Sequence, residues 1–215
     1  MKYKHIVWDW NGTIIDDVKL SVEIFNEMCD TCGIAGLDLD EYQRKFKIPV
    51  SDFYVEHGFD YNKFDFDKIS VYYVEQYNKR RFNCPLHDNV VEIMQFLNES
   101  GVSQSILSAY EQNYLRECVQ HYDLHKYMDN VFGLDNILAG SKAGLAKSLA
   151  ERIDAKGNEI LMIGDTIHDK DASDAMGADC VFVAKGHNSA DRLAKLGMPV
   201  FDSHAKLLEF IKECI

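Results

Sequence analysis

The sequence predicts an α/β fold in which a doubly wound parallel sheet forms the core and a small α-helical domain is inserted into it. Three observations predict this class. A strand-like run opens the chain, the segment 36–83 has helical character without a clear strand, and strand-like and helix-like segments alternate after Pro85. Alternation of this kind is typical of a parallel sheet that is covered by helices on both faces.

The first predicted element is a short buried strand over residues 5–10, which ends at the turn-like pair Asn11-Gly12. A helix is predicted over residues 18–33, with Asp17 as its N-cap. The apolar residues that recur there at helical spacing are Leu20, Ile24, Phe25 and Met28.

The insertion follows, with a clear helical segment over residues 68–80. The elements predicted after Pro85 are a helix over 90–97, a strand over 103–108, a helix over 111–121, a helix over 141–153, a strand over 160–163, a helix over 169–176, a strand over 181–183, a helix over 189–196 and a final helix from 203. We therefore expect a Rossmann-like core over 1–17 and 84–215, and a helical domain over 18–83.

Composition and charge limit the classes of partner. The 215 residues carry a formal net charge of −12, which would repel a nucleic acid, although a bound cation would still admit a small anion. No apolar run is long enough for a signal peptide or a membrane span, so we expect a cytoplasmic protein without membrane or nucleic-acid partners, as a monomer or weak dimer. The six cysteines lack the spacing of a disulfide framework. Cys29 and Cys32 form a C-x-x-C pair, for which a buried structural role is favoured over a redox or zinc role.

Three polar residues fall at the predicted carboxyl ends of strands. Asp9 ends the first strand, Ser108 ends the strand over 103–108, and Asp165 follows the strand over 160–163. Ligands of open α/β sheets bind outside the carboxyl ends of the strands. We therefore expect these three distant residues to meet in one pocket.

Four segments in this order resemble the motifs of the haloacid dehalogenase superfamily. They are Asp9-Trp10-Asn11-Gly12-Thr13, Ile106-Leu107-Ser108, Lys142 after Gly140-Ser141, and Gly164-Asp165-Thr166-Ile167-His168-Asp169. The resemblance covers nearly the whole chain and is closest to phosphoglycolate-phosphatase-like members. It implies that the helical domain over 18–83 is a mobile cap that closes over the site.

The resemblance implies a magnesium-dependent phosphohydrolase of a small phosphorylated metabolite, with Asp9 as the nucleophile and a phosphoaspartate intermediate. Mg²⁺ would be held by Asp9, by Asp165 and by the backbone carbonyl of Asn11. Hard cations prefer such oxygen ligands. Asp169 would either bind the metal through water or orient Lys142, and both roles stay open. For the same reason His168 is expected to be an exposed loop histidine and not a ligand.

The remaining site residues would contact the phosphoryl group. The resemblance gives Lys142 and Ser108 catalytic roles, in which they hold the phosphoryl oxygens by charge and by a hydrogen bond. Ala109 would join them in binding the substrate, and Thr13 would position the loop after the nucleophile. Asp16 is interpreted as part of a hinge into the insertion.

One residue departs from the usual phosphatase pattern. Asn11 stands where phosphatases of this superfamily carry the aspartate that protonates the leaving group and later activates water. An amide cannot exchange a proton at neutral pH, and general acid–base catalysis is typically worth on the order of 10²- to 10⁴-fold. We therefore expect a preference for activated acyl or aryl phosphates. The alternatives are a pseudoenzyme that binds a phosphorylated ligand, a hydrolase that cleaves another bond, and, least favoured, a phosphomutase.

The segment 46–54 of the insertion is a candidate substrate loop, because Pro49 interrupts the helical pattern there. Three cations near it, Arg44, Lys45 and Lys47, have two interpretations. They would either meet a second anionic group of the substrate or form a solvated charged face, and the second interpretation is slightly favoured.

Overall fold

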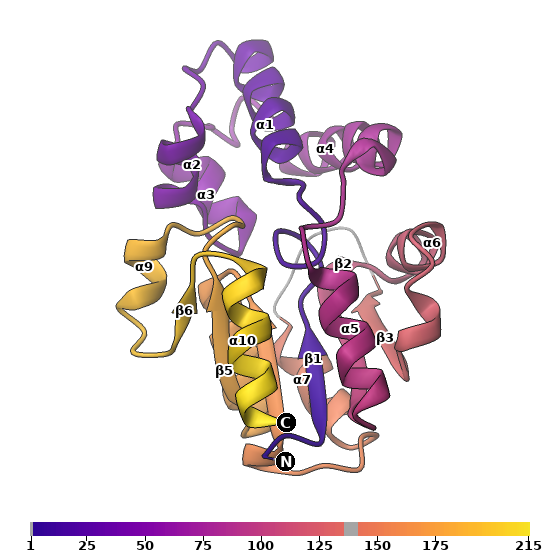
Figure 1. The fold of residues 1–215 in the computed structure, drawn as a ribbon. Coiled ribbons are helices and arrows are strands. Elements are labelled where there is room, and N and C mark those ends of the chain that lie inside the picture. The colour runs from indigo at the N-terminus through magenta and orange to yellow at the C-terminus, as the bar shows by residue number, and fades with distance from the viewer. Residues whose placement is uncertain (1, 136–141) are drawn as a thin grey trace.

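The computed structural model describes residues 2–135 and 142–215, which form one six-stranded parallel sheet (Figure 1). Its strands are β1 (His5–Trp8), β2 (Ser103–Glu111), β3 (Asn130–Leu134), β4 (Ile160–Gly164), β5 (Asp179–Val183) and β6 (Val200–Phe201). They lie in the order β3-β2-β1-β4-β5-β6. The predicted parallel α/β fold is confirmed. The direction of the strand order reverses between β1 and β4, and this is the place where α/β sheets bind ligands.

The helices form two groups (Figure 1). Helices α1 (Val18–Cys32), α2 (Leu39–Lys45), α3 (Val50–Glu56) and α4 (Phe66–Arg80) lie together beyond the carboxyl edge of the sheet, at the end opposite the two termini. The helices that flank the sheet are α5 (Val90–Glu99), α6 (Gln112–His121), α7 (Ala143–Ala150), α8 (Ile167–Met176), α9 (Ala190–Ala194) and α10 (His204–Cys214). Short 3-10 helices occupy Arg81–Asn83, His125–Tyr127 and Gly157–Glu159. No helix in the described ranges is long and apolar enough to cross a membrane.

Alternate side chains of β1 face opposite sides of the sheet, as a period of two requires. Ile6 and Trp8 belong to the hydrophobic cluster that contains the buried residues of α5 and α10. Val7 belongs to a second cluster with the buried residues of α7 and α8. Both clusters are excluded from water, so the central strand is fixed from both sides and presents its carboxyl end at a defined place.

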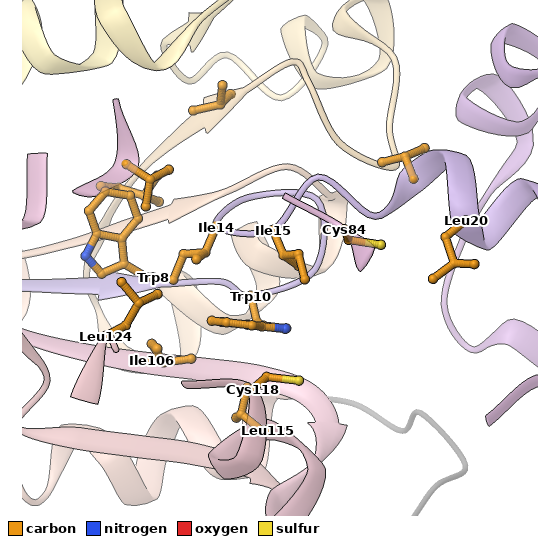
Figure 2. Close-up of a cluster of buried hydrophobic side chains, with 14 of the residues drawn as sticks. Trp8, Trp10, Ile14, Ile15, Leu20, Cys84, Ile106, Leu115, Cys118 and Leu124 are labelled. Carbon is orange, nitrogen blue, oxygen red and sulfur yellow. The ribbon is translucent and has the colours of Figure 1, made fainter. Parts of the chain in front are cut away.

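Trp10 anchors the chain immediately after the site residue Asp9. Its ring is fully buried, and Figure 2 shows it between the turn that carries Ile14 and Ile15 and the α6 side chains of Leu115 and Cys118. Its partners therefore come from several elements. Because a buried indole of this size holds its backbone firmly, the loop that follows β1 starts from a rigid position.

Two strands were not predicted from the sequence. β6 spans only Val200–Phe201, which is too short for a periodic signal. β3 contains Gly133, which weakens strand propensity. A Cβ at Gly133 would lie 2.6 Å from the carbonyl oxygen of Tyr110, so the close approach of β3 to the end of β2 needs a residue without a side chain.

The helix predicted over 18–33 is confirmed as α1, and Asp17 occupies its N-cap position as predicted, but without the side-chain bond of a capping residue. Its carboxylate makes no capping hydrogen bond to α1. It accepts hydrogen bonds from the Gly12 amide and from the side chains of Asn11 and Tyr77 instead. A capping bond to the first turn of α1 would use the same carboxylate oxygens that accept these three hydrogen bonds. The carboxylate binds the other partners and not the helix amides.

The buried ring of His204 makes the free energy of unfolding sensitive to acid. Its Nε2 donates a 2.8 Å hydrogen bond to the carbonyl of Thr13, and burial, together with the nearby His87, lowers its pKa from 6.5 to about 4. The unfolded chain therefore binds more protons than the folded chain between these two values. The contribution of His204 to stability should be complete above pH 6.5 and should fall toward pH 4 by at most about 1.4 kcal/mol per pH unit.

Urea unfolding at about pH 7 and about pH 5 measures this loss. His204→Gln keeps a hydrogen-bond donor but cannot titrate, so this variant should lose less stability between the two pH values. An equal loss in the native protein and the variant would contradict the assignment to His204.

Candidate active site

The structure brings together the predicted residues of four distant segments at the carboxyl edge of the sheet. Asp9 follows β1, Asp165 follows β4, Asp169 lies in the first turn of α8, and Lys142 directly precedes α7. All four are at most 4% exposed. Ligand atoms of the three carboxylates lie within 4.8 Å of one another. Gly140 and Ser141, quoted with Lys142 in the sequence, lie outside the described residues.

Lys142 neutralises part of this acidic cluster. Its ammonium group forms ion pairs with Asp9 Oδ1 and, at 2.6 Å, with Asp169 Oδ1. Burial alone would lower the pKa of Lys142, but the two carboxylates outweigh it, so the pKa rises above its usual value. Lys142 thus stays charged, and it is not the surface lysine that its position near a helix start could suggest.

The pKa of Asp9 lies well above its ordinary value. Burial is the main cause, and the charges of Asp169 and Asp165 add to it, while Lys142 opposes it. Burial also raises the pKa of Asp165. When ionised, the three carboxylates carry more negative charge than Lys142 compensates, and a further bound cation would offset the difference.

Asp165 is held by hydrogen bonds from both sides. Its Oδ1 accepts from the Thr13 hydroxyl at 2.9 Å, and its Oδ2 accepts from the backbone amide of His187 at 2.5 Å. A Cβ at Gly12 or at Gly186 would collide with this carboxylate. Thr13 thus fixes the carboxylate of another segment.

Asp169 uses its two oxygens differently. Oδ2 accepts from the backbone amide and the hydroxyl of Thr166, at 2.9 and 2.8 Å, and so forms a capping box at the start of α8. Oδ1 binds Lys142. Of the two roles left open for Asp169, this geometry matches the orientation of Lys142.

The side-chain amide nitrogen of Asn11 donates two hydrogen bonds. Its Nδ2 donates to Asp17 Oδ2 at 2.7 Å and to the Tyr77 hydroxyl at 2.8 Å, and Tyr77 in turn donates to Asp17. A carboxylate at position 11 would lose both donated bonds and face the charge of Asp17. An amide therefore suits these neighbours better than the usual aspartate would.

His187 was not among the predicted site residues. It follows β5 at the same edge of the sheet, and its Nε2 lies 3.4 Å from Asp17 Oδ1, while Nδ1 lies 3.1 Å from the Tyr42 hydroxyl. Burial alone would lower the pKa of His187, but Asp17 outweighs it and raises the pKa to about 9. The ring is thus a cation at neutral pH. In the sequence, only the position of His187 after a predicted strand could have indicated that it belongs to the site.

Ser108 and Ala109 line the same cavity as Asp9. The predicted strand ended at Ser108, whereas β2 continues to Glu111 with a register shift after Leu107. The Ser108 hydroxyl accepts a 3.1 Å hydrogen bond from the Tyr110 amide. Its own proton remains available to a ligand oxygen.

A cavity of about 150 Å³ connects these residues with the α1–α4 layer. Asp9, Asn11, Ser108 and Lys142 form its polar end. The candidate substrate loop contributes lining residues from its whole length, namely Phe46, Ile48, Val50, Phe53 and Tyr54. The position of the cavity allows a ligand to contact the acidic cluster and the helical layer at once.

The three cations near that loop do not line the cavity. Lys47 pairs with Glu56 at 2.5 Å, and Lys45 pairs with Glu41 at 3.7 Å. Arg44, like them, is absent from the described lining residues. This arrangement matches the favoured interpretation, a solvated charged face.

His168 is not the exposed loop histidine that the sequence predicted. His168 lies in the first turn of α8, is half-buried, and donates from Nε2 to the carbonyl of Ile48 at 2.8 Å. Further bonds join the same loop to the core: Asn188 and Arg192 donate to the carbonyl of Phe46. The α1–α4 layer is therefore docked onto the core at this loop.

The C-x-x-C pair lies on α1, apart from the acidic cluster. Cys29 is buried in the apolar cluster and burial raises its pKa to about 12, while Cys32 is half-buried and carries a free thiol. Within residues 2–135 and 142–215, the group with metal-binding geometry is the trio of aspartates.

Comparison with known proteins identifies the family. The model of the haloacid dehalogenase-like hydrolases matches residues 6–183, so the chain belongs to this family and the expected hydrolase class is confirmed. Similar curated proteins include the tyrosine-protein kinase PtkA of Mycobacterium tuberculosis, 21% identical over 98% of this chain and 72% of that protein. Another is a 5'-nucleotidase of Pseudomonas aeruginosa, 20% identical over 90% of this chain and 88% of that protein.

Solved structures show the same fold. A predicted phosphatase from Clostridium acetobutylicum superposes with a TM-score of 0.81 at 19% identity, over 99% of this chain and all of that one. A predicted phosphoglycolate phosphatase from Haemophilus somnus gives a TM-score of 0.75 at 16% identity, over 98% and 99% of the two chains. Structures of phosphoglycolate-phosphatase type are thus among its neighbours, as the sequence predicted.

Proposed function

We propose that the protein is a magnesium-dependent phosphohydrolase of a small phosphorylated metabolite, with Asp9 as the nucleophile. The observation that carries the proposal is the buried cluster of Asp9, Asp165 and Asp169, in which Lys142 pairs with Asp9 and Asp169, next to a cavity that Asp9 and Lys142 line. The names of two similar proteins support phosphoryl chemistry: the 5'-nucleotidase and the pyrophosphatase PpaX of Bacillus cereus, 26% identical over 79% of this chain.

The donor set fits a hard divalent cation. Asp9 and Asp165 offer carboxylate oxygens, and burial, with the charge of Asp169 as a lesser cause, raises the pKa of both groups. In the proposal Mg²⁺ is held by these two side chains and by the backbone carbonyl of Asn11. When bound, it would offset the charge of the nucleophile and of the phosphoryl group. Asp169 contributes by holding Lys142.

The chain's own residues then perform the following steps. A carboxylate oxygen of Asp9 attacks phosphorus, the bond from phosphorus to the leaving oxygen breaks, and its electron pair stays on that oxygen. Lys142 and the Ser108 hydroxyl hold the phosphoryl oxygens, with Ala109 beside them. Water then cleaves the phosphoaspartate, which returns Asp9 as a carboxylate and releases phosphate.

Asn11 limits which leaving groups depart easily. Its amide cannot donate a proton to the leaving oxygen, so alcohols of low pKa should leave much faster than simple alkyl alcohols. For the native protein, kcat/KM across a series of aryl and alkyl phosphates should fall steeply as the pKa of the alcohol rises. A series without such dependence would count against the proposed role of Asn11.

Asn11→Asp tests the same point from the other side. The new carboxylate would face Asp17, which raises the pKa of one of the two groups and destabilises the fold. The double variant Asn11→Asp/Asp17→Asn exchanges the amide and the carboxylate, so that position 17 donates the hydrogen bond and position 11 accepts it. It therefore serves as the matched variant without the carboxylate repulsion. Alkyl phosphate hydrolysis should rise about 10²-fold in the variant that stays folded, because a general acid is regained. No gain in either variant would contradict the proposal.

Residues 18–83 are proposed to form a cap domain on a core of residues 1–17 and 84–215. Two chain crossings join the parts, and the Asp16 amide donates to the Pro85 carbonyl at 2.9 Å where they run side by side. Opening at this hinge would break the bonds from His168, Asn188 and Arg192 to the loop. Closure would exclude water and set specificity. The competing proposal, a binding protein without turnover, retains the same closure.

A further inference from the structure

The walls of the cavity are largely aromatic. Phe25 of α1 and Phe53 of α3 stack with ring centroids 4.9 Å apart, and Tyr73 and Tyr77 of α4 stack at 6.1 Å. All four line the cavity, together with Phe46. Rigid ring faces and edges bind another flat ring well and offer little to a small hydrophilic group. The part of a bound ligand that extends away from the polar end of the cavity therefore contacts a surface suited to an aromatic ring.

The charges around the cavity disfavour a second anionic group. Asp17 and Glu111 line it in addition to Asp9. Among the lining residues that the structure describes, the cations are Lys142 and His187. Lys142 is paired with two carboxylates, and His187 is paired with Asp17. A carboxylate or second phosphate on the ligand would lose its hydration without gaining a free cation.

Two polar atoms among the described lining residues lack a hydrogen bond, the hydroxyl of Ser70 and Nε2 of His187, and the second of them forms an ion pair with Asp17 at 3.4 Å. The hydroxyl of Ser70 on α4 is buried without a hydrogen bond, its residue is 6% exposed, and it lines the cavity. Buried hydroxyl groups are normally satisfied. A ligand atom that hydrogen-bonds to Ser70 would satisfy this one, and it would fix the orientation of a ring held between the aromatic walls.

We infer that the substrate is the phosphate monoester of a phenol whose ring carries an uncharged polar substituent, bound by Ser70. The inference rests on the phosphohydrolase function proposed above and names its substrate class. The bond between phosphorus and the phenolic oxygen breaks, the electron pair stays on that oxygen, and the oxygen–phosphorus bond to Asp9 forms. The phenolate departs without a proton and later takes one from water, which suits a site with Asn11 in place of an acid.

Binding of non-hydrolysable analogues tests the substrate class without turnover. Titration calorimetry in the presence of Mg²⁺ would compare phenylphosphonate with its 4-hydroxymethyl and 4-carboxy derivatives. The hydroxymethyl compound should bind about tenfold more tightly than phenylphosphonate, and the carboxy compound about tenfold more weakly. Ser70→Ala should abolish the advantage of the hydroxymethyl group. Ser148→Ala, an exposed serine within α7, should preserve it.

Two binding results would each overturn the inference. One is binding of the carboxy compound at least as tight as that of phenylphosphonate. The other is a hydroxymethyl advantage that Ser70→Ala leaves unchanged. Phosphate release from phenyl phosphate, measured in parallel, separates this inference from the proposed function. The expected binding order without any turnover would support the ligand class and reject the hydrolase, whereas faster release from phosphoglycolate than from phenyl phosphate would reject the aromatic class and keep the hydrolase.

Discussion

Asp9→Asn should reduce kcat/KM for phosphate release from phenyl phosphate by about 10⁴-fold or more, because the amide is not a nucleophile and no phosphoaspartate can form. The fold should survive the change. Burial and the neighbouring carboxylates already raise the pKa of Asp9, so removal of its charge relieves repulsion. Urea unfolding should therefore show a free energy of unfolding equal to or above that of the native protein.

Asp16→Asn is the matched control for this experiment. It makes the same chemical change at an exposed position in the same loop, and it should keep native activity. Retention of activity by Asp9→Asn, or equal losses in both variants, would contradict the assignment of Asp9 as the nucleophile.

Lys142→Met should have the second-largest effect and should differ from Asp9→Asn in its effect on stability. Loss of the cation leaves Asp9 and Asp169 buried without their partner, which costs about 3 kcal/mol of unfolding free energy. The loss should be greatest at neutral pH and smaller in acid, where protonation of Asp9 removes the unpaired charge. Activity should fall about 10²- to 10³-fold, because the phosphoryl oxygens lose a donor.

Lys147→Met provides the comparison for Lys142, since Lys147 is an exposed lysine on α7. Activity assays and urea unfolding near pH 7 and near pH 5 would be run on both variants and on the native protein. If Lys142→Met were as stable as the native protein at neutral pH, the ion pairs with Asp9 and Asp169 would not hold the cluster together.

The sheet and the position of the site could be predicted from the sequence for a simple reason. Buried strands of a parallel sheet leave continuous apolar runs, and the residue that ends such a run lies at the ligand-binding edge. Asp9 and Asp165 were located by this rule alone, and the structure places both at the reversal of strand order. No knowledge of side-chain packing was needed for them.

The remainder depends on tertiary contacts that local patterns do not encode. The capping role of Asp17 was predicted from its place before α1, whereas Asn11, Tyr77 and His187 from three other segments engage its carboxylate. In the sequence, Gly133 argues against a strand. The structure shows that a glycine is needed there, because the carbonyl of Tyr110 leaves no room for a side chain. The sequence does not single out Ser70 in α4. Its hydroxyl becomes a candidate ligand contact only because the structure places it, without a hydrogen bond, in the wall of the cavity.

Covalent chemistry at Asp9 is the central claim, and rapid acid quenching during turnover of phenyl phosphate tests it most directly. Asn11 cannot activate water for the second step, so the phosphoaspartate should accumulate, with a burst of about one phenol per active site ahead of phosphate release. Mass spectrometry of the quenched protein should locate one phosphoryl group on the peptide that contains Asp9. Turnover with the phosphoryl group on another residue, or an equal burst from Asp9→Asn, would contradict the claim.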